Sequence, residues 1–308
     1  MSTVAIVVAL AMAGAFGPVA ARFAPLLPPR HATWLISAGA VASALCSLAV
    51  LGVLASVLLG QLPLFADEGH WSTAVLRHHE ITEPGVAVVA GALLLASAGG
   101  LALAARRLAL ALVAAYRSCA EMPADAGGLV VLRDGPAQAA AVPGRPGRVV
   151  VAESLLVALR APERRALLAH ERAHLAHGHH WHRGAVTLAA AANPLLAPLR
   201  SAVVYATERW ADEEAAAQVG DRRQVATALA RAALLGRPPA AGALALAAQA
   251  VPARVAALLA RPPRPRPLLV LALAAIPLIG ALALLVLLEQ ADRVFDLATQ
   301  VYAVSHAA

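Results

Sequence analysis

Residues 169–175 read Ala-His-Glu-Arg-Ala-His-Leu and place two histidines, His170 and His174, four positions apart. On an α-helix, residues with this spacing lie on one face about one turn from each other, so both imidazoles can bind the same metal ion. Glu171 follows the first histidine directly and can act as a general base toward water beside that ion. This His-Glu-x-x-His pattern therefore predicts a zinc site on a helix.

The residues around this motif favour a helix. Pro162 suits a first helical position, Glu163 suits the electropositive helix N-terminus, and Gly178 is a common stop signal. Residues 164–177 contain neither proline nor glycine. A solvated, histidine-rich helix without a metal is the alternative interpretation, so the spacing is a strong signal that does not suffice alone.

The composition indicates a membrane protein. Of the 308 residues, 60% are hydrophobic and only 14% are charged, whereas soluble domains carry about 25% charged residues. Four apolar segments without charge are long enough to cross a bilayer as helices. They comprise residues 4–20, 34–62, 86–105 and 268–288.

These segments divide the chain into three parts. Residues 1–117 form an N-terminal membrane region with three of the four predicted transmembrane helices. Residues 118–266 form a more polar domain that contains the histidine motif, and residues 267–308 form the fourth transmembrane helix and a short tail. We therefore expect a predominantly α-helical, multi-pass membrane protein with a small α+β domain.

The charge distribution predicts how the chain is oriented in the cell membrane. Between residues 106 and 266 lie 21 of the 25 basic residues, all of them arginine, whereas the segment 63–84 is acidic. Because basic loops stay on the inner side, the domain should face the cytoplasm, and the N-terminus and the C-terminal tail should lie outside. The net charge of +7 is not accompanied by a nucleic-acid-binding motif, so we expect no direct nucleic-acid binding.

Within the domain, two β-branched runs bounded by Gly and Pro predict strands at residues 128–133 and 148–152, with a turn at 142–147. Helices are expected at 153–160, 162–177, 201–218, 221–235 and 251–260. The apolar segment 185–197 is broken by proline, and we interpret it as a buried or membrane-resting helix rather than a fifth span.

A catalytic zinc ion needs a third protein ligand, and two residues compete for this place. His180 follows His170 by ten residues, but the protease pattern with that spacing requires glycine where this chain has His177. Glu208 lies four residues before Asp212 on one face of a predicted helix. Glu208 could complete a site of two histidines and one glutamate, with Asp212 accepting a hydrogen bond from a ligating histidine. An acidic, solvated helix face is the alternative.

Together, the two motifs resemble those of the gluzincin membrane peptidases. The pattern Glu208-x-x-Ala211-Asp212 follows His170-Glu171-x-x-His174, and residues 193–196 (Asn-Pro-Leu-Leu) stand between them. These features and the flanking spans look most like the BlaR/MecR-type branch, while the CAAX-prenyl endopeptidase and HtpX branch shares both motifs. BlaR/MecR sensors also carry an extracellular penicillin-binding domain, which we expect this chain to lack.

The resemblance implies a role for each motif residue. One Zn²⁺ per chain would be bound by His170, His174 and Glu208, Glu171 would be the general base, and Asp212 would support a ligand. The family also binds its substrate as an added strand on an exposed sheet edge. We expect residues 148–152 to form that edge, with the substrate-strand candidates Arg148, Val149, Val150 and Val151.

These inferences predict a membrane-embedded, zinc-dependent endopeptidase of gluzincin-like fold that cleaves protein or peptide substrates at the cytoplasmic side. A cytoplasmic repressor in a signalling pathway and a membrane protein in quality control both fit as substrates. No residue can be named as the donor to the oxyanion, although Tyr205 and Arg209 lie near the second motif. The alternative is a non-catalytic or latent membrane scaffold that retains the zinc site.

Overall fold

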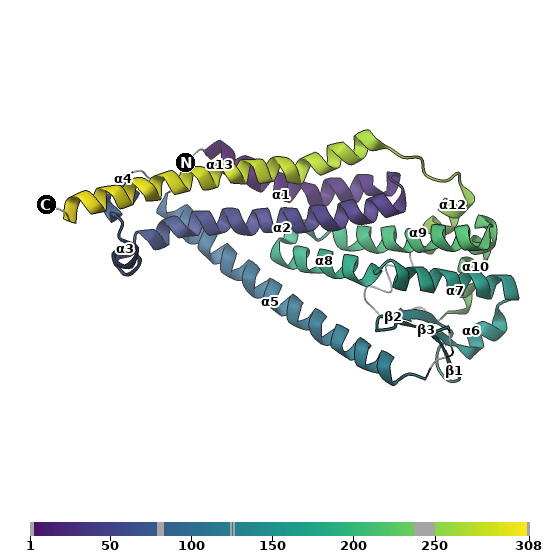
Figure 1. Cartoon of the computed structure of the whole chain (residues 1–308). Helices are drawn as coiled ribbons and strands as arrows, with labels where there is room; N and C mark the ends of the chain where they lie inside the picture. The colour runs from purple at the N-terminus through teal and green to yellow at the C-terminus, as the bar shows by residue number, and fades with distance from the viewer. Residues whose placement is uncertain (1–2, 79–82, 124, 126, 237–249, 307–308) are drawn as a thin grey trace.

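The computed structural model describes residues 3–78, 83–123, 125, 127–236 and 250–306. Long helices run side by side through an elongated molecule, and a small sheet with shorter helices forms one end (Figure 1). The predicted fold class is confirmed, because four helices are long and apolar enough to cross a membrane and three strands form a sheet. The four long helices are α1 (Thr3–Phe23), α2 (Pro29–Gly60), α5 (Pro84–Glu121) and α13 (Pro267–His306).

Two of these helices extend well beyond the predicted spans. Helix α5 continues past Ala105, through Arg106 and Arg107, and α13 continues past Leu288. Neither extension contains proline or glycine, so nothing in either sequence stops the helix where the predicted span ends. With 38 residues, α5 is about 57 Å long, which exceeds the roughly 30 Å hydrocarbon core of a bilayer. It therefore connects the membrane region to the sheet.

The membrane helices α1, α2 and α13 pack closely against one another. Small side chains lie at their contacts, which lets the helix backbones approach each other. Among the buried ones are Ala9, Ala13, Ala20, Ala40 and Ala44. Helix α5 diverges from this group and leaves space for a shorter helix, α8 (His179–Ala192), between it and α2 (Figure 1).

Helix α8 covers residues 185–192 of the apolar segment that was predicted as a buried or membrane-resting helix, and it ends before Asn193 and Pro194. Its residues Val186 and Ala189 are buried in the same core as α2, as expected for a buried helix, while its position relative to a bilayer stays a prediction. Two polar contacts also attach this part of the domain to the membrane region. His182 Nδ1 lies 3.0 Å from Ser37 Oγ, and Asn193 Nδ2 donates to Ser47 Oγ at 2.9 Å.

The remaining elements are short. At the end of the molecule far from the sheet lie α3 (Pro63–Gly69) and α4 (Thr73–His78) (Figure 1). The 3-10 helices are η1 (Ala24–Leu26) and η2 (Pro194–Leu196). The domain helices are α6 (Glu153–Ala158), α7 (Ala161–Ala176), α9 (Leu199–Val219), α10 (Arg222–Leu235) and α12 (Val251–Leu259), close to the predicted ranges.

The sheet contains both predicted strands and one that the sequence did not reveal. The order is β1 (Leu129–Leu132), β3 (Arg148–Ala152), β2 (Ala139–Val142). Strand β3 pairs in parallel with β1 and antiparallel with β2. Strand β2 reads Ala-Ala-Ala-Val, and alanine is depleted in strands, so this segment lacked the expected signal.

This strand order corrects the prediction of the substrate-binding edge. Residues 148–152 form the middle strand, with hydrogen-bonded neighbours on both sides. Val149, Val150 and Val151 are buried. Arg148, Val149, Val150 and Val151 therefore cannot receive an added strand, and the edge beside α7 belongs to β2 instead.

Candidate metal centre

Helix α7 presents the histidine motif and has well-defined ends. At its start the backbone N–H of Arg160 donates to Glu163 Oε2 at 2.8 Å, and Glu163 also forms an ion pair with Arg231 on α10 at 2.7 Å. At its end Gly178 adopts a left-handed conformation with φ 59°, which suits glycine after a helix. The predicted start and stop signals are thus confirmed, and the chain turns there directly into α8.

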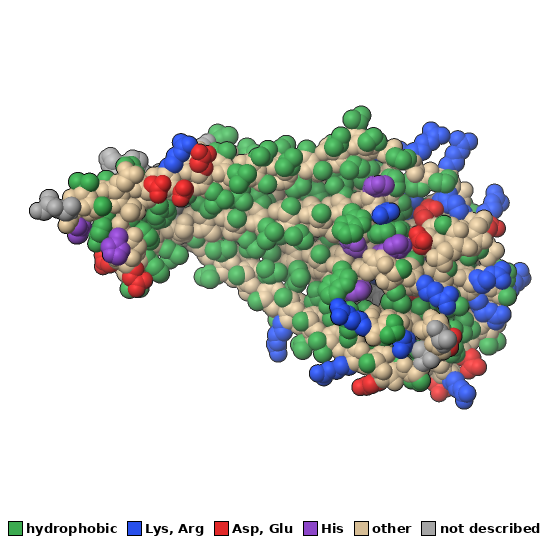
Figure 2. Space-filling model, viewed as in Figure 1, with side chains coloured by type: hydrophobic (Ala, Val, Ile, Leu, Met, Phe, Trp, Pro, Cys, Tyr) green, Lys and Arg blue, Asp and Glu red, His purple; other side chains and the backbone are tan. Residues whose placement is uncertain are grey.

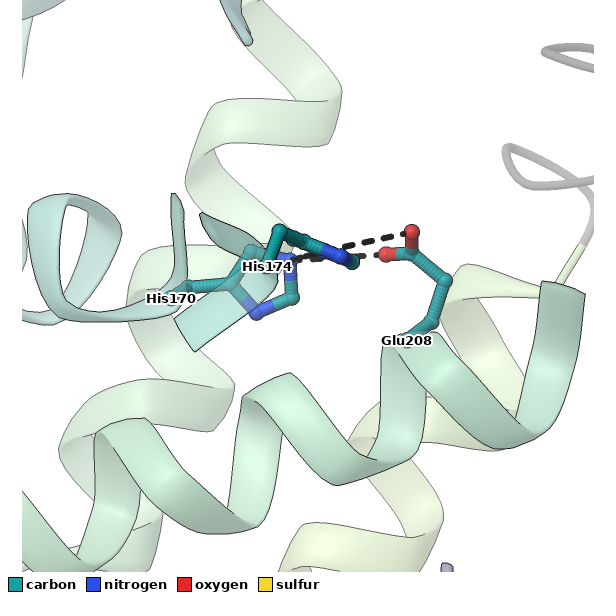
Figure 3. Close-up of side chains that lie close together, drawn as sticks. All are labelled: His170, His174 and Glu208. Atoms are coloured by element: carbon teal, nitrogen blue, oxygen red, sulfur yellow. Dashed lines mark hydrogen bonds and ion pairs between the residues drawn. The ribbon is translucent and has the colours of Figure 1, made fainter. Parts of the chain in front are cut away.

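The two histidines of α7 and Glu208 of α9 point toward one another (Figure 3). The Nε2 atoms of His170 and His174 are 3.2 Å apart, and the Glu208 oxygens Oε2 and Oε1 lie 3.4 and 3.5 Å from them, respectively. A tetrahedral zinc site with bonds of 2.0–2.1 Å has ligand atoms about 3.3 Å from each other. The donor types and their separations therefore fit a zinc ion.

This geometry distinguishes between Glu208 and His180, the two candidates for the third ligand. Glu208 joins His170 and His174 in a group whose ligand atoms all lie within 4.8 Å of one another. His180 follows the turn at Gly178, and it lines the adjoining cleft without belonging to that group among the described residues. The structure thus brings together the ligand set that Glu208 completes.

Each histidine is oriented through its other ring nitrogen. Asp212 is 2% exposed, and its Oδ1 lies 3.0 Å from His170 Nδ1, as the predicted supporting role requires. For His174 the partner is His179, whose Nδ1 lies 2.8 Å from that of His174. The sequence analysis did not find this contact, because His179 was one of several histidines in the same tail. Such contacts fix the tautomer and the direction of a ligating imidazole.

Two arginines that the sequence analysis missed bind the carboxylate of Glu208. Arg254 of α12 is 4% exposed and forms an ion pair with Glu208 Oε2 at 2.7 Å, and it also donates from Nε and Nη2 to Asp212 at 2.8 and 2.7 Å. Arg183 of α8 donates from Nη2 to Glu208 Oε1 at 2.7 Å. The chain has 25 arginines, and no motif or spacing distinguishes Arg183 or Arg254 from the others, so their place in the site could not be predicted from the sequence.

These cations keep two buried carboxylates ionised. Burial by itself would raise the pKa of Glu208 and of Asp212, but the charge of Arg254 and the contacts with His170 outweigh it and lower both pKa values. In the absence of metal, burial disfavours the charge on His170, yet hydrogen bonds to Asp212 and Glu208 raise the pKa of His170 to about 10. Burial and the neighbouring His170 lower the pKa of His174 to about 2.

Glu171 differs from the other two carboxylates. Burial raises its pKa, and the negative charge of Glu208 adds to this effect, while the backbone amide of Ala141 donates to it and acts in the opposite direction. Glu171 faces a cleft of about 380 Å³. The cleft is lined by the ligand residues and by β2 residues Ala139, Ala140 and Ala141, together with Pro143, Leu175, His179, His180 and Arg183.

One of the comparisons with known proteins agrees with this site. Residues 112–262 match Peptidase family M48, a segment that runs from the last part of α5 to just beyond α12. It contains both motifs, β2 and both arginines of the site. No curated protein and no solved structure matches the chain. The family match indicates a metallopeptidase.

The third ligand can be tested by measuring bound zinc. We expect the detergent-purified wild type to bind about one zinc ion per chain, Glu208→Ala to lose most of it, and His180→Ala to retain it. Elemental analysis after dialysis against a weak chelator gives the stoichiometry. Loss of zinc from His180→Ala alone would show that the ligand set is wrong, and a folded wild type that binds none would fit the non-catalytic scaffold.

Zinc binding should also release a proton. His170 must be neutral to bind metal, and because its pKa in the metal-free site is about 10, a proton occupies it at neutral pH. Zinc affinity should therefore increase with pH, by about tenfold per pH unit from pH 6 to 9. Titration calorimetry in buffers of different ionisation enthalpy counts the released protons. An affinity that stays constant over this range would contradict the charge distribution described above.

Proposed function

We propose that this protein is a zinc-dependent endopeptidase of the M48 type, in which His170, His174 and Glu208 bind the metal and Glu171 is the general base. The observation that carries the proposal is the set of three ligand atoms at zinc-like separations beside a cleft that contains both Glu171 and the outer edge of β2, which pairs with no other strand of the described residues. At this edge the backbone N–H of Ala141 donates to Glu171. When bound, zinc would act as a Lewis acid toward the scissile carbonyl and lower the pKa of a coordinated water.

Glu171 would transfer a proton from the attacking water to the leaving nitrogen. As the water oxygen adds to the carbonyl carbon, the Glu171 carboxylate accepts the proton that the water gives up. When the carbon–nitrogen bond breaks, Glu171 returns this proton to the leaving nitrogen, so the immediate products are a carboxylic acid and an amine. A pKa raised by burial brings Glu171 closer to the range that suits a general base.

The substrate would lie along β2 as an added strand. Ala152 donates from its backbone N–H to Gln138 at 2.9 Å, which makes residues 138 and 152 a hydrogen-bonded pair. In an antiparallel ladder such pairs alternate, so Ala140 faces β3 while Ala139 and Ala141 direct their backbone groups away from it. A substrate that pairs with this edge must be extended. We therefore propose unfolded or flexible segments of proteins as substrates.

The charge distribution supports a cytoplasmic site. Arginine side chains gather at the end of the molecule that holds the sheet and α10, among several acidic ones, whereas the charged side chains at the opposite end are mainly acidic (Figure 2). That opposite end includes Asp67 and Glu68 of α3, and Asp292 and Asp296 of α13. By the positive-inside rule, we propose that the catalytic end lies in the cytoplasm and both termini outside. Substrates would then be membrane proteins or cytoplasmic proteins such as a repressor.

The role of Glu171 can be tested with the substitution Glu171→Gln. We expect peptide cleavage to decrease by a factor of about 10² to 10⁴ with zinc still bound, because the amide cannot accept a proton but does not remove a ligand. Cleavage of a fluorescence-quenched peptide library and elemental analysis provide the two measurements. Glu153→Gln, at an exposed position on α6, is the control. Full activity of Glu171→Gln would exclude Glu171 as the base.

The β2 edge can be tested with Ala139→Pro. Proline removes the backbone N–H that faces the substrate but leaves the hydrogen bonds between β2 and β3, so kcat/KM should decrease about fivefold, which corresponds to about 1 kcal/mol. Ala139→Gly keeps the N–H and should cleave like the wild type. The zinc content and the unfolding temperature of both variants show whether the site is intact. Equal activity of Ala139→Pro and the wild type would mean that the substrate does not pair at this position.

A further inference from the structure

Peptide hydrolysis needs a donor to the oxygen of the scissile carbonyl, because this oxygen becomes negative when water adds to the carbon. The two residues near the second motif do not supply it. Tyr205 lines a different cavity, with Ala21, Pro25 and Glu208 but with neither Glu171 nor a residue of β2. Arg209 lies over the Tyr205 ring and pairs with Glu213 at 3.7 Å. Neither residue lines the cleft that contains Glu171.

Arg183 does line this cleft, and its direction is fixed by two hydrogen bonds to α9. Its Nε donates to Thr207 Oγ1 at 2.9 Å, and its Nη2 donates to Glu208 Oε1 at 2.7 Å. Thr207 is fully buried and also bonds to the carbonyl of Val203 at 2.9 Å, so it is an immobile acceptor. The guanidinium is therefore held beside the metal ligands before any substrate arrives.

One side of the Arg183 guanidinium is left available to a substrate. The side chain is 34% exposed, and Nη1 forms no hydrogen bond or ion pair with the part of the chain that the structure describes. Ala139–Ala141 of β2 and Glu171 line the same cleft as Arg183. A peptide paired with β2 would bring its carbonyl group into the cleft that Glu171 and Arg183 share.

Arg254 is not equivalent to Arg183, although both contact Glu208. Its three guanidinium nitrogens are engaged with Glu208 and Asp212 at 2.7 to 2.8 Å, and the side chain is 5% exposed. Arg254 does not line the cleft beside β2, but it lines a smaller cavity of about 160 Å³ together with His170, Glu171 and Glu208. Because its three nitrogens are engaged, Arg254 is a positioning residue for Glu208 and Asp212, whereas Arg183 has a free donor in the cleft that β2 lines.

We propose that Arg183 is a catalytic residue that donates a hydrogen bond from Nη1 to the carbonyl oxygen of the scissile peptide bond. The assignment rests on the proposed endopeptidase function. As the water oxygen bonds to the carbonyl carbon, the π-electron pair moves to the carbonyl oxygen, and the charge-assisted bond to Arg183 strengthens. When the pair returns, the carbon–nitrogen bond breaks and Glu171 protonates the nitrogen. Arg183 keeps its protons throughout, as an arginine in a protein does.

The test compares Arg183→Gln and Arg183→Lys with the wild type in detergent, using a fluorescence-quenched peptide library as substrate. We expect Arg183→Gln to decrease kcat by a factor of about 10² to 10³, with KM and zinc content close to those of the wild type. Arg183→Lys keeps the positive charge but loses the planar guanidinium, so its kcat should lie between those of Arg183→Gln and the wild type. Arg165→Gln removes an exposed arginine from α7 and should have no effect.

A phosphinic peptide separates catalysis from structure, because its tetrahedral, anionic group imitates the state that Arg183 would stabilise. Its affinity should decrease in Arg183→Gln by the same factor as kcat. The assignment is overturned if kcat is unchanged, or if zinc is lost and added zinc restores kcat, since Arg183 would then only position Glu208. A wild type that cleaves no peptide would overturn the proposed function, and this assignment with it. If Arg183→Gln is as active as the wild type while Glu171→Gln is inactive, the assignment of Arg183 is overturned but the proposed function is not.

Discussion

Two buried carboxylates on one face of α9 are the constraint on which the domain depends. Glu208 and Asp212 are held out of water, where an unpaired charge would cost several kcal/mol. Their charges are compensated by Arg254 from α12, Arg183 from α8 and, in the metal-free site, by the proton on His170 of α7. The same ion pairs that satisfy the carboxylates therefore hold four helices around one centre. Arg254 pairs with both carboxylates, so its removal would disturb this centre most.

The cleft has one wall attached to the membrane helices and another attached to the sheet. Helix α8 carries Arg183 and His179 toward the site, while its Val186 packs in the core that it shares with α2. On the other side, β2 is attached to β3, and α7 lies against both strands. A change in how α8 packs between α2 and α5 would move Arg183 relative to the β2 edge. The geometry of the site is in this way linked to the packing of the bilayer helices.

The sequence predicted those parts of the structure that have a local pattern. The spacing of four residues identified His170 and His174, and the same spacing identified Glu208 and Asp212. Residues four positions apart lie on the same face of a helix, so each pair can act at one site. Strand β2 was not predicted, because its alanines are not β-branched. Without β2, residues 148–152 were wrongly assigned to the sheet edge that would bind the substrate. Arg183, His179 and Arg254 reach the site only through tertiary packing of α8 and α12. No spacing in the sequence encodes such contacts.

The same network also explains why three neighbouring carboxylates can have different roles. Glu208 and Asp212 each accept hydrogen bonds or ion pairs from a guanidinium, and their pKa values are lowered, so they stay ionised and can hold a metal ligand set in place. Glu171 is buried, no guanidinium of the described residues forms an ion pair with it, and burial raises its pKa. A carboxylate in this environment exchanges a proton more readily near neutral pH than its two neighbours do. The distribution of arginines thus separates the two carboxylates that stay ionised from Glu171, the proposed general base.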